Sequence, residues 1–197
     1  MVLTVKKTEG GQKLYEGVGY QRIGEIHYEK TCTSGREGER IGRNGVGAMI
    51  RLAAPGDAGQ LFALNEAFNG PGTATPDSIR ASLAENGREI VVIAEAEGGT
   101  LAGFVCAQVK RSFCYGEASA EITEVYVAPE YRRRGYGRAM LEFAERCCRE
   151  RFGVDGITLL TGKDNAAAQE LYAAAGYRRT GEVHYEKDCF AADRVAH

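Results

Sequence analysis

The chain has 197 residues, of which 44% are hydrophobic and 26% are charged, and its formal net charge is −2. This composition predicts a soluble globular domain with an appendage, and the near-neutral charge excludes a general nucleic-acid-binding surface. No apolar run approaches the roughly 18 to 20 residues of a membrane span, and the start, MVLTVKKTEGG, lacks the apolar core of a signal peptide. We therefore expect a cytoplasmic protein with no membrane or nucleic-acid partner.

The first 32 residues repeat the end of the chain. Leu3 to Cys32 aligns with Leu160 to Cys189 at a constant offset of 157, and more than half of the aligned positions are identical. A single repeat at the two ends indicates a duplicated strand–helix–strand tail rather than a solenoid. The segment could pack against the intact domain, exchange with the same segment of a neighbouring chain, or stay disordered. A homodimer could form through this segment or through the C-terminal strand.

Residues 33–47 form a glycine-rich, charged stretch without hydrophobic periodicity, which predicts a linker. A complete domain follows over residues 48–190, and residues 191–197 form a tail. Periodicity and breakers predict the order β-α-α-β-β-β-α-β-α-β in this domain. The segments are a strand from Met49, helices 58–68 and 77–86, strands 89–99, 100–113 and 117–129, a helix from about 135 to 152, a strand at 156–165, a helix at 166–177 and a last strand at 178–189.

Six cysteines are present, at positions 32, 106, 114, 147, 148 and 189. They form no C-x-x-C pair and have no histidine at the spacing of a metal ligand, so we expect no metal site and reduced thiols.

The stretch VYVAPEYRRRGYGRAM, from Val125 to Met140, joins a strand to a helix through a basic turn with two glycines. The first N–H groups of a helix have no intrahelical partner, and glycine lets the backbone approach a ligand. An anion can accept those bonds, and its charge is stabilised by the helix dipole. The pattern therefore predicts a pyrophosphate site at Gly135 and Gly137 with arginines around it. The alternative is a tight turn with solvated arginines.

The spacing R-x-x-G-x-G, from Arg132 to Gly137, follows V-x-P and resembles the acetyl-coenzyme A motif of the GCN5-related N-acetyltransferases. It is not a dinucleotide fingerprint, because Met140 stands where the third glycine would be. A second family pattern, N-x-x-A-x-x-L-Y-x-x-x-G-[FY], is met from Asn165 to Tyr177. The resemblance spans about residues 48–190. It implies an α/β fold in which a mixed, mostly antiparallel sheet is flanked by helices and splays apart at the acyl-coenzyme A site.

The resemblance also implies roles for particular residues. Backbone amides of Val125 and Val127 would bind the acyl and pantetheine portion of acetyl-coenzyme A. Asn165 would bind the pantetheine arm, and Ala168 is a further cofactor-binding residue. Tyr172 would contact the cofactor and protonate the leaving thiolate, although a tyrosine there can simply pack on the sheet. The pyrophosphate would be held by the turn, which consists of Arg132, Arg133, Arg134, Gly135, Tyr136, Gly137 and Arg138.

The chemistry of amine acetylation needs a base, because a protonated amine has no free lone pair and its pKa is near 10. Glu124 lies directly before the V-x-V strand and is our first candidate for that base. Glu121 would face the other side of a regular strand and is the second candidate, since a bulge between the two would move both.

The early pattern LFALNEAF and the acidic residue before V-x-V resemble the aminoglycoside 3-N-acetyltransferases of the same superfamily. A polycationic acceptor would need an acidic lining, for which Glu66, Asp77, Glu117, Glu121 and Glu124 are available. The leading hypothesis is acetyl transfer to a small-molecule amine, most specifically an aminoglycoside antibiotic. The alternatives are acetylation of a protein N-terminus or lysine, and a non-catalytic acyl-coenzyme A sensor or assembly module.

Overall fold

The computed structural model describes residues 2–5, 12, 15–16, 18, 20–32 and 48–186, and only the backbone of residues 2–5 and 186. The predicted linker and the tail at 191–197 lie outside the described residues. The strands are β1 (Val2–Val5), β2 (Gln21–Arg22), β3 (Glu25–Thr31), β4 (Met49–Leu52), β5 (Glu89–Glu95), β6 (Leu101–Lys110), β7 (Ala118–Val127), β8 (Val154–Gly162), β9 (Arg178–Arg179) and β10 (Val183–Glu186). The helices are α2 (Ala58–Asn69), α3 (Pro76–Glu85), α4 (Tyr136–Phe152) and α5 (Ala166–Ala174), with short 3-10 turns η1 (Pro55–Asp57) and η2 (Pro129–Tyr131).

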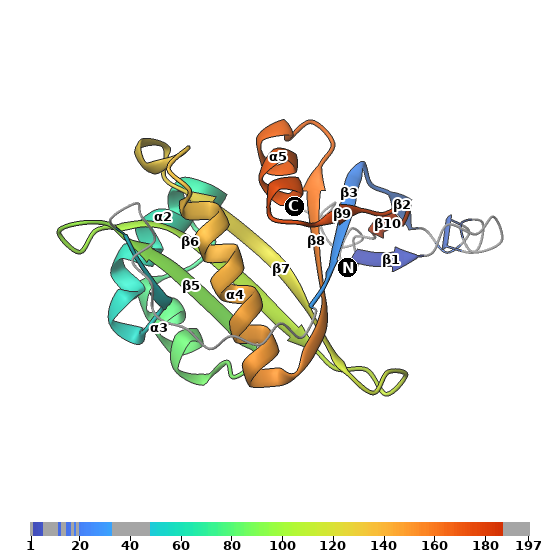
Figure 1. Ribbon diagram of the computed structural model, residues 1–197, viewed down its shortest axis with the longest axis horizontal. Coiled ribbons are helices and arrows are strands. Elements are labelled where there is room, and N and C mark those ends of the chain that lie inside the picture. Colours follow the sequence, from blue (N-terminus) through green and yellow to red (C-terminus); the bar gives the residue numbers. More distant parts are fainter. Residues whose placement is uncertain are drawn as a thin grey trace, which may run out of the picture.

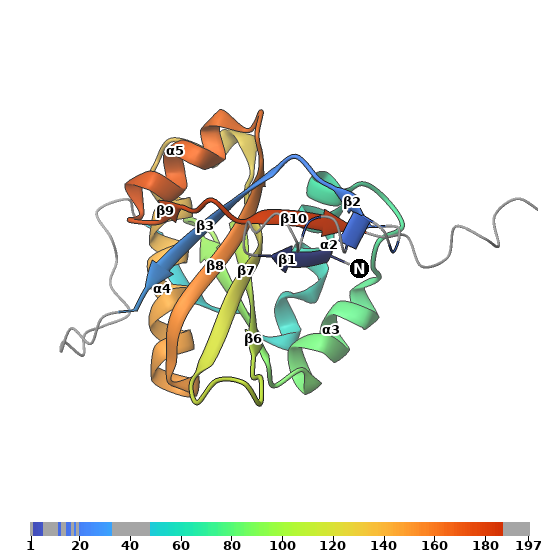
Figure 2. The same cartoon turned by 90° about the vertical axis from the view of Figure 1, so that its right-hand side faces the viewer.

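A seven-stranded sheet in the order β4-β5-β6-β7-β8-β3-β9 forms the centre of the molecule. Its pairs are antiparallel except for β7 with β8, so the predicted mixed, mostly antiparallel α/β fold is confirmed. Helices α4 and α5 cover one face of this sheet, whereas α2 and α3 cover the other (Figures 1 and 2). Each face therefore buries its own apolar cluster, of which Met140 and Phe104 are central members.

Helix α4 shows why this local sequence folds as predicted. Gly135 before the helix and Gly153 after it both have positive φ angles, which cost glycine little. Met140, Ala144 and Cys147 are buried at the expected i, i+4, i+7 spacing. The amphipathic stripe thus fixes which side of α4 lies on the sheet, and with it the direction of the turn at its N-terminus.

The last strand of the central sheet region differs from the prediction. Instead of one strand over 178–189, β9 and β10 are separate and belong to different sheets. The place between β8 and β9 is taken by β3, which comes from the N-terminal repeat. We call this place the slot.

Strand β10 pairs with β1 and β2 of the N-terminal copy in a second, three-stranded sheet. This small sheet lies on the side of the main sheet that also carries α2 and α3 (Figure 2). The two copies of the repeat have therefore exchanged their last strands within one chain. The sequence left three possibilities for the N-terminal segment. Its described part pairs with strands of the same chain in both sheets.

Candidate functional site

The parallel pair β7–β8 opens toward the N-terminus of α4. Its ladder runs from Ala118 opposite Val154 to Ile122 opposite Leu159 and ends there, while both strands continue. Beyond Ile122, the edge of β7 that faces β8 consequently has no ladder partner among the described residues. A ligand lying between the strands can bond to the backbone at Val125 and Val127, as the resemblance implies.

A cleft of about 740 Å³ lies at this opening, between α4 and α5, and we call it the α4–α5 cleft. Most of the predicted cofactor-binding residues line it together. These are Val125, Val127, Arg132, Arg133, Gly135, Tyr136, Gly137, Arg138, Asn165, Ala168 and Tyr172. Arg134 does not line the cleft, and its guanidinium lies 5.8 Å from the centre of the Tyr131 ring. Ala67 and Phe68 of α2 also line the cleft, and the sequence did not predict them.

The N-terminus of α4 is prepared for an anion. Gly135 occupies the cap position in the left-handed conformation, and no side chain of the described residues caps the helix. The first intrahelical bond runs from Ala139 N–H to Gly135 O at 3.0 Å, so the N–H groups of residues 136–138 are available. A Cβ atom on Gly137 would lie 3.2 Å from a Leu171 methyl group, which shows how closely α4 approaches α5 here. These features fit the pyrophosphate of coenzyme A.

Three arginines of the turn have hydrogen-bonded partners, and one of them, Arg138, donates from Nε to Glu142 of α4 at 2.8 Å. Arg132 donates from Nε to the carbonyl of Val127 at 2.9 Å, which ties the turn to the end of β7. Arg133 has a φ angle of 61° and reaches Glu170 of α5 at 3.4 Å across the cleft. A left-handed conformation is uncommon for arginine and points to a backbone shaped by the turn rather than by the residue.

A β-bulge places the candidate base. Cys106 of β6 pairs with Glu124, but the next residue, Ala107, pairs with Ile122, so Thr123 is the extra residue. Glu121 pairs with Gln108. Because Cys106 and Gln108 are two residues apart, they share the face that carries α2 and α3. The bulge therefore brings Glu121 and Glu124 to the same face, where a regular strand would have separated them.

The two carboxylates have different surroundings. Glu121 forms an ion pair with Lys110. Glu124 accepts a hydrogen bond from the Thr123 hydroxyl, and none of the ion pairs among the described residues involves it. An unpaired carboxylate is better suited to accept a proton from a substrate, which favours Glu124 over Glu121.

Cys106 is a site residue that the sequence did not reveal, because its position opposite Glu124 depends on the bulge. Burial raises the pKa of its thiol well above the usual value, and the carboxylates of Glu124 and Glu89 raise it further. The thiol therefore stays protonated and can donate a hydrogen bond to Glu124.

Tyr172 lines the α4–α5 cleft and is 6% exposed. Burial raises the pKa of its hydroxyl to about 12, so it remains a proton donor at neutral pH. Its ring packs against Tyr28 of β3, with the ring centres 5.9 Å apart. The residue packs on the sheet and also faces the cleft, so its position is compatible with both roles that the sequence left open.

The other predicted acidic residues do not gather at one place. Glu66 is half-buried on α2, and Asp77 pairs with Arg80 on the exposed first turn of α3. Glu117 is exposed next to the start of β7, at the opposite end of that strand from Val127 and roughly 30 Å away along it. None of the three lines the α4–α5 cleft or the smaller cavity between α2 and α3.

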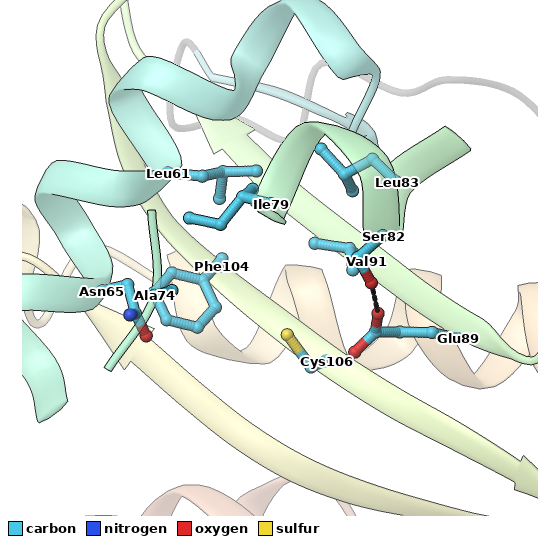
Figure 3. Close-up of a pocket in the computed structure, with 10 residues that line it drawn as sticks. All are labelled: Leu61, Asn65, Ala74, Ile79, Ser82, Leu83, Glu89, Val91, Phe104 and Cys106. Carbon is cyan, nitrogen blue, oxygen red and sulfur yellow. Dashed lines mark hydrogen bonds between the residues drawn. The ribbon is translucent and has the colours of Figure 1, made fainter. Parts of the chain in front are cut away.

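A second cavity of about 170 Å³ lies between α2, α3, β5 and β6, and we call it the α2–α3 cavity (Figure 3). It is on the same face of the sheet as Glu121 and Glu124. Its walls are Leu61, Ala74, Ile79, Leu83, Val91 and Phe104, and its polar groups are Asn65, Ser82, Glu89 and Cys106. Among the described residues, no group of three or more His, Cys, Asp or Glu could hold a metal ion, and no helix is long and apolar enough to cross a membrane.

A model of the acetyltransferase (GNAT) family matches residues 61–177. Among solved structures, an aminoglycoside acetyltransferase from an uncultured soil metagenomic sample is 22% identical, with a TM-score of 0.59 over 66% of this chain and 88% of that chain. AAC(6')-Iy in complex with a bisubstrate analogue of coenzyme A and acetylneamine is 20% identical, with a TM-score of 0.64 over 72% and 99%. A GCN5-related N-acetyltransferase from Sphaerobacter thermophilus is 19% identical, with a TM-score of 0.63 over 94% of this chain and 58% of that chain.

Proposed function

Because the chain belongs to the acetyltransferase (GNAT) family and is an acetyl-coenzyme A-dependent N-acetyltransferase, we propose that it acetylates a primary amine of a small molecule, most specifically an aminoglycoside antibiotic. The observation that carries the proposal is the bulge that points Glu124 to the α2–α3 face while Val125 and Val127 face the α4–α5 cleft. Donor and acceptor then approach β7 from its two sides. The aminoglycoside assignment is also supported by the structural likeness to enzymes that act on such compounds.

The residues of the chain would act in a defined sequence. Acetyl-coenzyme A supplies a thioester whose carbonyl carbon is attacked by the amine nitrogen. Glu124 accepts the proton that the amine must lose, directly or through water, and backbone N–H groups of the free β7 edge stabilise the oxyanion. When the carbon–sulfur bond breaks, Tyr172 donates its proton to the thiolate, which leaves as the free thiol. The second proton lost by the nitrogen returns to Tyr172 through water.

The decisive experiment measures free thiol released from acetyl-coenzyme A in the presence of aminoglycosides, short-chain amines and peptides with free N-termini. We expect turnover with small amines and the highest kcat/KM with an aminoglycoside. Turnover with peptides alone would favour the protein-acetylating alternative. Absence of turnover with every amine, together with tight binding of acetyl-coenzyme A, would favour the sensor.

A further inference from the structure

The α2–α3 cavity holds a carboxylate that has no cationic partner in the part of the chain that the structure describes. Glu89 Oε2 accepts a hydrogen bond from the Ser82 hydroxyl at 3.0 Å, and Oε1 accepts one from the Gln108 amide at 2.9 Å. Figure 3 shows the carboxylate turned toward Ser82 beside the apolar wall of the cavity. None of the ion pairs among the described residues includes it. A negative group in a mostly apolar cavity attracts an ammonium group carried on an apolar stem.

The position of Glu89 relative to Glu124 suggests the length of that stem. The two residues stand on β5 and β7, with β6 between them, and their partners on β6, Gln108 and Cys106, are two residues apart. Standard sheet spacings put their Cα atoms about 12 Å apart. Ammonium–carboxylate contacts at both ends leave roughly 6 to 8 Å between two nitrogen atoms, the span of about four or five methylene groups.

We propose that the α2–α3 cavity binds the second ammonium group of the acceptor, held by Glu89, while the reacting amine lies at Glu124. The occupant is an amine with a second cationic group four or five carbons away, either as a linear diamine or as two amino groups of a larger polyamine. This inference rests on the proposed function and specifies its acceptor.

The test compares 1,5-diaminopentane with 1-aminopentane, which has the same stem without the second ammonium. For the wild type we expect kcat/KM to be at least about tenfold higher for the diamine, because a charged hydrogen bond is lost with the monoamine. Glu89→Gln keeps the shape, and its amide can accept from Gln108 and donate to the Ser82 hydroxyl, so only the charge is lost and the ratio should fall to about one. Glu97→Gln, on an exposed turn, is the matched control and should retain the ratio.

Two results would overturn the inference: a diamine preference that survives Glu89→Gln, or no preference in the wild type. If no amine is acetylated at all, calorimetric titration of 1,5-diaminopentane into the coenzyme A-bound protein still decides it. Binding weakened about tenfold by Glu89→Gln supports the cavity assignment although the proposed function has failed, whereas equal or absent binding rejects it.

The slot carries a second inference, which rests on the exchange of strands. In the main sheet, Arg179 of β9 pairs with Tyr28 of β3, and in the small sheet Arg22 of β2 pairs with Tyr185 of β10. Both members of these pairs are related by the offset of 157. Each copy of the repeat therefore pairs its short strand with the long strand of the other copy, in the same register.

The contacts that hold β3 in the slot use residues that both copies contain. Residues 25–30 read EIHYEK and residues 182–187 read EVHYEK, so one position differs, and that difference is a single methylene group. In the slot, Tyr28 packs on Tyr172, and Lys30 donates to Glu145 at 2.7 Å. If residues 182–187 took the register of β3, Arg179 would pair with Tyr185. The five residues between them, which include Gly181, are a length at which neighbouring antiparallel strands form hairpins.

We infer that the two long strands are alternative occupants of the slot. When β3 leaves, residues 182–187 of the same chain fold back beside β9 and take its place. The N-terminal copy is then a replaceable part of the sheet, and the fold tolerates the loss of either long strand but not of both.

Proline substitution with cysteine crosslinking tests this inference in the full chain. Glu29 of β3 lies opposite Thr158 of β8, and Glu186 has the equivalent position in the other copy. The pair Thr158→Cys and Glu29→Cys should crosslink in the otherwise unchanged chain, as judged by peptide mapping. Adding Tyr28→Pro removes an N–H from the middle of the sheet and expels β3. The pair Thr158→Cys and Glu186→Cys should then crosslink at least about tenfold more than without the proline.

The matched control is Tyr185→Pro, the same change at the equivalent position, which should leave the 29–158 crosslink intact. The variant with both prolines should unfold, because no occupant remains. If Tyr28→Pro alone unfolds like the double variant, or folds without gaining the 186–158 crosslink, the strands are not interchangeable and the inference is rejected.

Discussion

Acidification from pH 7 to pH 5 should destabilise the protein by about 2 kcal/mol through His184. This residue of β10 is 1% exposed, and burial lowers its pKa from 6.5 to about 4, with a smaller contribution from the nearby His27 ring and an opposing one from Glu121. The centres of the two imidazole rings are 5.2 Å apart. The pKa is lowered in the folded state, so the unfolded chain binds more protons between pH 6.5 and 4. The free energy of unfolding must therefore fall as the pH falls through this window.

The assay is urea unfolding, monitored by far-ultraviolet circular dichroism at half-unit steps between pH 5 and 7. Over this range the reference pKa values of aspartate and glutamate, about 3.9 and 4.3, keep most carboxylates ionised. His184→Gln retains a polar side chain that cannot titrate, and it should flatten the pH profile. A wild-type profile that is already flat, or an equal slope in the variant, would refute the idea that His184 is held neutral in the fold.

Three further predictions concern the site. Glu124→Gln should lower kcat by about 10²- to 10⁴-fold with little change in the Kd of coenzyme A, and a larger loss in Glu121→Gln would transfer the role of base to Glu121. Gly135→Asp should weaken coenzyme A binding at least tenfold in calorimetry. The aspartate places a negative charge beside the pyrophosphate, and its side chain is strained at the φ of 83° that Gly135 adopts. Retained affinity would mean that the pyrophosphate binds elsewhere. Tyr172→Phe should lower kcat while the alkaline limb of the pH–rate profile stays unchanged below pH 10, since the wild-type hydroxyl has a pKa of about 12; an unchanged kcat would leave Tyr172 a packing residue.

The α4–α5 cleft was predictable from sequence because its parts are local. A strand, a turn with glycines at two fixed positions and an amphipathic helix are encoded within residues 125–152, and their order determines the geometry. The partners Asn165 and Tyr172 follow on the next helix. The resemblance supplied their roles, and the structure places them on the same cleft.

Features that depend on pairing between distant strands could not be decided from sequence, which raised a bulge between Glu121 and Glu124 only as a possibility. The bulge at Thr123 decides which face Glu124 occupies, yet it exists only in the register between β6 and β7. That register also places Cys106 beside the carboxylate. The α2–α3 cavity that holds Glu89 likewise forms only when α3 lies against β5. A period-two pattern shows that a strand is present, but one extra residue within that strand moves every side chain beyond it to the other face.

The exchanged strands set a different limit, because two nearly identical segments satisfy the same local pattern. Sequence cannot choose between them when each offers the slot the same tyrosine, glutamate and lysine. The choice nevertheless matters for the site, since the occupant supplies the ring against which Tyr172 packs and the ammonium that binds the Ala175 carbonyl just after α5. Residues 25–31 of β3 therefore form part of the wall behind the α4–α5 cleft. If the C-terminal strand could not replace them, their removal would disturb Tyr172 directly, and the cofactor end of the reaction would depend on the N-terminal repeat.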